Sequence, residues 1–213
     1  MRSYDEYCAI AKSLDLVGDR WTLLVIRELS LRGPSRYTDL RNGLPGVATN
    51  LLADRLRELE AAGLVAREEA PPPVATALFR LTPRGEGLRP VLDELMRWGL
   101  PLMFEQRDED AVRSHWLAGA IELMLGDRRS AGDPATLEIR FGDGPVALEL
   151  RDEALHVSLG AAPDPEAVLT GPERPILGLL LGYLQLDQAE EQGVEVAGDR
   201  AVLDRFVPEP AAD

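Results

Sequence analysis

The chain has 213 residues and a formal net charge of −14, and 45% of its residues are hydrophobic. That length suits one large domain or two small ones, and no apolar run approaches the ~20 residues of a membrane-spanning helix. No segment reads as a signal peptide, and the single cysteine, Cys8, excludes an internal disulfide framework. The sequence therefore predicts a cytoplasmic protein with no membrane partner.

Charge is distributed unevenly along the chain. Residues 1–100 carry 14 basic and 14 acidic side chains, whereas residues 101–213 carry 9 basic and 23 acidic ones. Such asymmetry is typical of two modules with separate tasks, and an acidic module repels DNA. We therefore expect two domains, over residues 1–104 and 112–208, with any DNA contact in the first.

The first half predicts four helices in succession. Apolar residues from Tyr7 to Val17 recur at helical spacing, and Asp19 can cap a second helix that is closed by Gly33. A short third helix can be capped by Ser35. After the turn at Pro45-Gly46, a fourth helix is expected to run to Gly63.

Two strands and a last helix follow. Residues 64–65 and 77–81 read as short strands, separated by the proline-rich stretch from Ala70, which predicts a loop. A last helix over residues 83–104 carries an apolar stripe. Three short helices, a two-stranded wing and a closing helix are typical of a winged helix-turn-helix, in which the helix after the tight turn enters the DNA major groove. The sequence predicts core packing for Trp21 and Trp98.

The fourth helix has two contrasting faces. At 100° per residue, Leu52, Leu56 and Leu59 share one face, which we expect to be buried. Thr49, Asn50 and Arg57 lie opposite, where asparagine can read adenine and arginine can read guanine or phosphate. The alternative is an ordinary surface helix whose charged side chains pair with one another, and only the order of the surrounding elements favours the DNA-reading helix.

The same residues carry a family resemblance. The stretches "CAIAKSLDLVGDRWTLLVIREL", "SRYTDLRNGLPGVATNLLADRLRELEAAGLVAR" and "LTPRGEGLRPVLDELMRWG" closely resemble HxlR-type transcriptional regulators. The resemblance implies a homodimer on a two-fold-related DNA operator, paired through the first and last helices. The predicted DNA contacts are Arg36, Thr38, Arg41, Thr49, Asn50, Ala53, Arg55, Arg57, Arg67 and Arg80.

Two features depart from or qualify this resemblance. The wing contains Glu68, Glu69 and three prolines rather than basic residues, so few cations are left to hold the operator and a modest salt dependence is expected. Cys8 matches the position of a thiol sensor in some family members. The alternative is a small buried hydrophobe, and the acidic residues nearby do not favour a reactive thiolate.

In the second half, the spacing of apolar residues changes from helical to alternating. A helix within "HWLAGAIELMLG" precedes three strands, "TLEIRF", "PVALELR" and "ALHVSL", each with one apolar face. An apolar helix in "ERPILGLLLGYLQL", a short polar helix, the strand "VEVAGD" and a last helix capped by Asp199 follow. The fold class expected for the chain is α+β, with a winged helix-turn-helix followed by an antiparallel sheet covered by helices.

The ending of this half resembles the sterol-carrier-protein-like domain. That resemblance implies an apolar cavity for acyl or sterol-like molecules between the sheet and the helices. The alternative is a closed core that needs no ligand, which we expect for any single one of these residues. The cavity candidates are Trp116, Leu123, Phe141, Leu148, Leu150, Val157, Ile176, Leu177, Leu180, Leu181 and Leu184.

Enzyme chemistry finds no support in the sequence. His115 and His156 are the only histidines, no paired metal-ligand spacing occurs, and no nucleophile elbow or phosphate loop is present. We therefore expect no catalytic residues, no metal and no cofactor. Two alternatives to a ligand-modulated regulator stay open: a lipid-binding protein with a vestigial DNA-binding domain, and a regulator triggered by Cys8.

Overall fold

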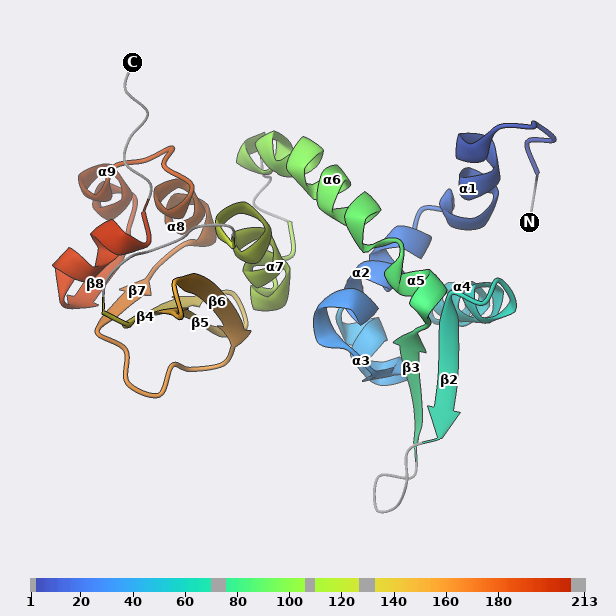
Figure 1. Ribbon diagram of the computed structural model, residues 1–213, viewed down its shortest axis with the longest axis horizontal. Helices are drawn as coiled ribbons and strands as arrows, with labels where there is room; N and C mark the ends of the chain where they lie inside the picture. The colour runs from blue at the N-terminus through green and yellow to red at the C-terminus, as the bar shows by residue number, and fades with distance from the viewer. Residues whose placement is uncertain (1–2, 70–75, 106–109, 127–132, 208–213) are drawn as a thin grey trace. The chain divides into compact units, whose positions relative to one another are not determined.

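The computed structural model describes residues 3–69, 76–105, 110–126 and 133–207. The chain forms two compact units, Met1–Trp98 and Gly99–Asp213, which are described separately below (Figure 1). Within the described residues, no helix combines the length and the apolar character needed to cross a membrane.

The first unit contains the expected succession of helices. They are α1 (Ala9–Val17), α2 (Thr22–Arg32), α3 (Tyr37–Asn42) and α4 (Thr49–Ala61). Periodicity located all four because each has a buried apolar side, as expected for helices that share one core.

Three strands, rather than the expected two, form the sheet of this unit. β2 (Val65–Glu69) and β3 (Ala77–Leu81) form the antiparallel wing hairpin, and β1 (Ser35–Arg36) pairs with the other edge of β3. In Figure 1 the hairpin projects from the helices. Ser35 is therefore a strand residue and not a helix cap, and its hydroxyl donates to the Gly33 carbonyl oxygen. The predicted proline-rich loop at residues 70–75 lies outside the described residues.

Two other helix predictions were wrong. Asp19 does not cap α2, which begins at Thr22 after Trp21, because the Asp19 carboxylate instead pairs with Arg55 of α4. The last helix is not continuous: α5 (Pro83–Glu86) and α6 (Arg89–Gly99) are separate, and the 3-10 helix η1 (Leu100–Glu105) follows. Pro101 lacks the N–H that α-helical bonding needs, which explains the change of helix type there.

The core of the first unit confirms the inward face of α4. Leu52 is 0% exposed, and Leu56 and Leu59 are each 2% exposed. They pack in one cluster with Ile26 of α2 and Phe79 of β3, among other residues. Burying three leucine side chains contributes roughly 5–9 kcal/mol relative to their exposure, which fixes the rotation of α4 about its axis.

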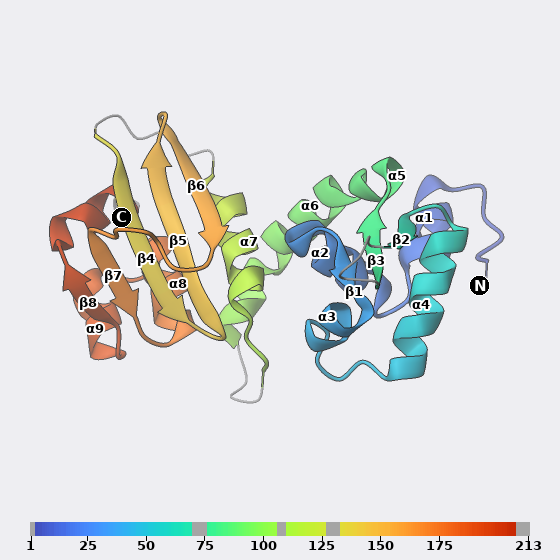
Figure 2. The same ribbon diagram turned by 90° about the horizontal axis from the view of Figure 1, so that it is seen from below.

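The second unit is a sheet covered on one face by helices (Figure 2). Its sheet has the order β6-β5-β4-β7-β8, in which β6, β5 and β4 are the predicted meander. The elements are α7 (Ser114–Leu125), β4 (Ala135–Phe141), β5 (Gly144–Arg151), β6 (Ala154–Leu159), β7 (Ala167–Thr170), α8 (Glu173–Leu180), α9 (Leu186–Glu191), β8 (Glu195–Gly198) and η2 (Arg200–Arg205). As predicted, the Asp199 carboxylate caps the last of these by accepting from the Ala201 N–H.

The α+β class is as expected, but the sheet of the second unit is mixed and not purely antiparallel, which corrects that part of the prediction. β7 pairs in parallel with β4, because the chain crosses the sheet between β6 and β7 before it enters β7. Figure 2 shows this crossing over the face opposite the helices. Glu138 lies beneath it, 2% exposed, and accepts from the Ala162 N–H and from Arg140. Glu138 is thus a buried carboxylate whose charge is compensated by these two donors.

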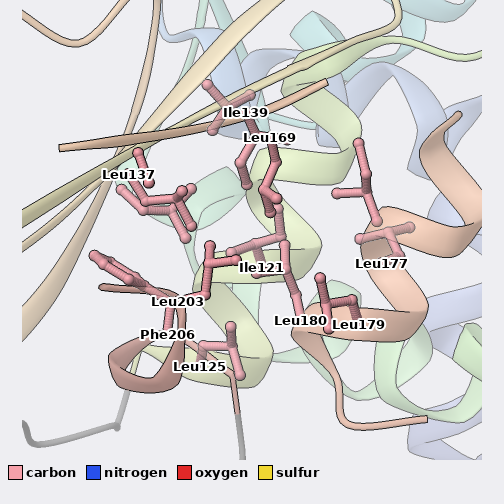
Figure 3. Packing of buried hydrophobic residues seen from close by; sticks show 14 of the residues in the cluster. Ile121, Leu125, Leu137, Ile139, Leu169, Leu177, Leu179, Leu180, Leu203 and Phe206 are labelled. Atoms are coloured by element: carbon pink, nitrogen blue, oxygen red, sulfur yellow. The ribbon is translucent and has the colours of Figure 1, made fainter. Parts of the chain in front are cut away.

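The core of the second unit lies between the sheet and its helices. Figure 3 shows Leu137 and Ile139 of β4 directed toward Ile121 of α7 and toward Leu177 and Leu180 of α8. Four of these five side chains are fully buried, and Leu177 is 4% exposed. The alternating apolar residues of the strands thus meet the apolar sides of the helices, as the change of period predicts.

Candidate nucleic-acid interface

One face of α4 is presented outward. Thr49 and Asn50, at the first turn, and Arg57, two turns further on, are exposed. Ala53 between them is half-buried. The N-terminal end of a recognition helix is where base contacts are made, and here it carries two small polar side chains.

The start of α4 is held by a tyrosine of the preceding helix. The Tyr37 hydroxyl donates to the Thr49 carbonyl oxygen at 2.7 Å. Between α3 and α4, the chain turns through Gly46, whose φ of 84° favours glycine. The turn and the hydrogen bond together set the direction in which α4 leaves the helix-turn-helix.

A buried carboxylate supports the same turn from inside. Glu28 of α2 is 0% exposed and pairs with Arg27 at 2.8 Å. A Cβ atom at Gly43 would lie 2.0 Å from a Glu28 carboxylate oxygen, so any other residue at this position requires the Glu28 side chain to move. Burial of the Arg27 guanidinium lowers its pKa, against the opposite effect of Glu28.

A pocket of about 250 Å³ lies between the start of α3 and the wing. It brings together three of the predicted DNA-contact residues: Arg36 before α3, Thr38 within it and Arg67 on β2. Sequence reasoning missed the remaining residues of the lining, although Tyr37 belongs to the "SRYTDL" stretch quoted above. These are Tyr37, Thr76, Ala77 and Phe79.

The predicted DNA-contact arginines fall into two groups, of which the first is engaged with carboxylates. Arg55 has a side chain that is only 15% exposed, and it joins Asp19 and Glu58, so that it anchors α4 to the segment before α2. The other three paired arginines are more exposed. Their partners are Asp54 for Arg57, Glu69 for Arg67 and Glu68 for Arg80.

The second group consists of Arg36 and Arg41. Both are exposed, and within the described residues neither has a carboxylate at salt-bridge distance. Two uncompensated guanidinium groups therefore flank α3. At the wing, the hydrogen bond from Arg80 at 2.6 Å lowers the pKa of Glu68, and Glu68 in turn raises the pKa of Arg80. That pair therefore stays charged at neutral pH.

α1 and α6 expose large apolar side chains within the first unit. Tyr7 and Ile10 of the α1 region are 108% and 71% exposed, and Trp98 of α6 is 74% exposed. The prediction that Trp98 packs in the core was therefore wrong, whereas half-buried Trp21 packs against the core as predicted. Cys8 is also exposed, which excludes the buried alternative for this thiol.

The cavity candidates of the second unit lie in and around its core. Six of them are buried in the core cluster, and Val157 and Leu181 pack against it. Trp116, Leu123 and Leu184 are half-buried and lie outside the cluster. A ligand cavity among these residues stays a prediction. The six buried candidates are Phe141, Leu148, Leu150, Ile176, Leu177 and Leu180.

Comparison with known proteins agrees with this geometry. A family profile described as HxlR-like helix-turn-helix matches residues 16–107. The transcriptional regulator YkvN of Bacillus subtilis is 37% identical over 95 residues, which cover 43% of this chain and 77% of YkvN. The chain belongs to the HxlR-like family of helix-turn-helix transcriptional regulators.

Two further transcriptional regulators match the same half of the chain. The regulator YvaP of B. subtilis is 33% identical over 87 residues, covering 41% of this chain and 80% of YvaP. Among solved structures, the reduced form of the B. subtilis regulator YodB has 30% identity and a TM-score of 0.39, covering 44% of this chain and 92% of that one. In each case the matched part is less than half of this chain.

Proposed function

We propose that this HxlR-type regulator binds a two-fold-related DNA operator as a homodimer and places α4 in the major groove. The observation that carries the proposal is the burial of Leu52, Leu56 and Leu59, which leaves Thr49 and Asn50 exposed at the start of α4. Asparagine can donate to and accept from adenine in the major groove. The arginines of the wing and before α3 contact DNA phosphates and so fix the position of the protein along the double helix.

The exposed apolar residues of α1 and α6 support a homodimer. Tyr7, Ile10 and Trp98 expose large apolar side chains that a monomer would leave in water. A two-fold contact between copies covers the same patch on both chains, so one surface meets itself. Dimerisation then places two copies of α4 on half-sites one helical turn apart, about 34 Å.

The second unit is proposed to act as a sensor for an apolar molecule. Its support is the resemblance to the sterol-carrier-like domain and a core of sheet and helices rich in leucine. A ligand that favours one arrangement of the second units would change the spacing of the recognition helices by shifting populations. The second half of the chain carries its net negative charge, and DNA phosphates repel an acidic unit.

Titration of operator DNA tests the DNA-binding proposal. The operator is a site selected from the DNA upstream of the gene that encodes this chain. Fluorescence anisotropy should show that the wild type binds this site tightly and binds unrelated DNA more weakly. Asn50→Ala should weaken operator binding about 10-fold, since one bidentate base contact is worth about 1–3 kcal/mol. The matched control is Gln192→Ala, an exposed amide of the second unit. Equal loss on unrelated DNA would contradict base reading by Asn50.

Mass spectrometry of the protein as isolated tests the sensor proposal. A bound apolar molecule should be found in the intact chain and should change operator affinity when it is extracted and restored. Leu180→Trp, which fills the buried side of α8, should displace it. A bound molecule whose removal leaves operator affinity unchanged would exclude the sensor role.

A further inference from the structure

The pocket at the base of the wing is suited to an anion. Arg36 has no carboxylate partner within the described residues, and the Arg67 guanidinium is 3.4 Å from the Glu69 carboxylate. Both members of that pair are more than half exposed, and such pairs hold their partners weakly. Two guanidinium groups are therefore available to an incoming anion, and the hydroxyls of Thr38 and Thr76 add two further donors.

The shape and lining of the pocket favour a phosphate group. Guanidinium groups bind phosphate oxygens through two parallel hydrogen bonds, which gives strength as well as geometry. A volume of about 250 Å³ leaves room for a phosphate with its neighbouring sugar. Phe79 and Ala77 add two apolar residues to the lining, beside which a sugar can lie.

One side chain of this pocket also contacts the recognition helix. Tyr37 is one of the residues that line the pocket, and its hydroxyl donates to the carbonyl oxygen of Thr49, the first residue of α4, at 2.7 Å. A movement of the Tyr37 ring is thus passed to the end of α4 that carries Asn50. The other groups of the pocket have no hydrogen bond to α4 within the described residues.

We propose that this pocket is a seat for a backbone phosphate of the operator, and that Tyr37 transmits its occupancy to the start of α4. Arg36 and Arg67 bind the phosphate. Tyr37 is a positioning residue, because it acts on base reading through Thr49 and Asn50 and does not itself read a base. This inference rests on the proposed role of α4 in DNA recognition. It adds that a phosphate contact in the pocket, which does not depend on DNA sequence, controls the base contacts of α4, which do.

The first experiment needs no operator. Amide NMR spectra of the full chain are recorded with added sodium phosphate, against sodium chloride at equal ionic strength. Phosphate should shift the amides of Arg36 and Thr38 and also those of Thr49 and Asn50. In Tyr37→Phe, the shifts at Arg36 and Thr38 should remain while those in α4 disappear. A short duplex of unrelated sequence should shift the same amides, which distinguishes backbone phosphate from free phosphate.

The second experiment measures discrimination between operator and unrelated DNA. Tyr37→Phe should lower operator affinity about 5-fold and leave both the affinity for unrelated DNA and the salt dependence unchanged. Arg36→Gln should lower both affinities and reduce the slope of log K against log salt by about one. In the Tyr37→Phe background, Arg36→Gln should no longer change the ratio of the two affinities. Matched controls in the second unit are Tyr183→Phe and Arg174→Gln.

The outcomes separate this inference from the function on which it rests. Failure of the wild type to discriminate its operator contradicts the proposed function, while the phosphate spectra still test the seat and its link to α4. Absence of shifts at Arg36 and Thr38 excludes the seat. Shifts at Thr49 that persist in Tyr37→Phe, or shifts with free phosphate and none with the duplex, overturn the inference as well. Unchanged thermal unfolding of Tyr37→Phe confirms that the variant is folded.

Discussion

The two units of the chain differ in how their exposed apolar side chains are arranged. In the second unit, strands and helices enclose a leucine-rich core in which Ile121 and Leu148 are both 0% exposed. In the first unit, a comparable core coexists with a tyrosine, an isoleucine and a tryptophan that stand in solvent on α1 and α6. The second unit also exposes Leu159 and Tyr183, at 52% and 60%. The exposed apolar residues of the first unit differ in that they recur at helical spacing along one element, as Val91, Leu95 and Trp98 do on α6, and a second molecule can cover such a stripe.

The two units also differ in their charged side chains. The first unit has equal numbers of basic and acidic side chains up to residue 100, yet Arg36 and Arg41 lack carboxylate partners among the described residues. In the second unit, even the buried Glu138 is compensated by Arg140 and by a backbone N–H. Arg174 of the second unit is exposed and has no carboxylate partner among the described residues either, so an unpaired arginine alone does not locate a DNA-binding surface. We infer that surface from the position of Arg36 and Arg41 at the two ends of α3.

The largest expected effect concerns the packing of the second unit's core around Leu148. Leu148→Ala should lower the free energy of unfolding by about 2–5 kcal/mol, because it leaves a cavity at a fully buried position. Urea unfolding followed by circular dichroism measures the change. Leu159→Ala, at a side chain that is 52% exposed on the neighbouring strand, is the control and should cost far less. Equal costs would contradict the burial of Leu148.

The open apolar surface of the first unit predicts a different response. Ile10→Ala combined with Trp98→Ala should convert the dimer to monomer and lower operator affinity about 100-fold, because buried aromatic residues carry much of the binding energy of an interface. Thermal unfolding of the monomer should stay nearly unchanged. Sedimentation equilibrium measures the change. Tyr183→Ala, also exposed but in the second unit, should have neither effect. A dimer unaffected by the double substitution would remove these helices from the interface.

A smaller effect concerns the masked cations of the wing. Glu68→Gln frees Arg80 and should raise DNA affinity about 3-fold and steepen its salt dependence by up to one charge. Because Arg80 lowers the pKa of Glu68, the pair is present at neutral pH and is lost only as the pH falls through that lowered value. Glu149→Gln, which breaks a similar pair with Arg151, should leave DNA binding as it is.

The smallest expected effect is at the edge of the open surface. Asp15 accepts hydrogen bonds from the Tyr4 N–H at 2.9 Å and from the Ser3 hydroxyl, and the first of these does most to lower its pKa. This stabilisation is present above the ordinary pKa of aspartate and is lost as the pH falls through the lowered one. Asp15→Asn should speed exchange of the Tyr4 amide several-fold at neutral pH. An unchanged exchange rate would show that the carboxylate does not hold this segment.

The periodicity of apolar residues was sufficient to predict a side chain's environment wherever that environment depends only on the helix or strand to which the residue belongs. The period of Leu52, Leu56 and Leu59 gave both the helix and its buried face, and alternation gave the three strands of the meander. Periodicity does not tell whether an apolar side faces the chain's own core or another molecule, which is why Trp98 was misplaced. It also gave no sign of β7, a strand of four residues.

Contacts between distant residues were the part that pattern did not reveal. Asp19 reads as a helix cap until the fold brings it to Arg55, 36 residues away. Tyr37 reads as one more apolar residue of a short helix, and only the turn after α3 brings its hydroxyl to Thr49. The pocket likewise joins residues from β1, α3, β2 and β3, which no local spacing relates.

Sedimentation velocity on a labelled operator duplex, combined with footprinting, tests the central claim most directly. Two chains should bind each duplex, and protection should fall on two major-groove segments separated by about one turn of the double helix. A complex of one chain per duplex, or protection confined to a single groove segment, would show that α4 is not presented to DNA by a symmetric pair.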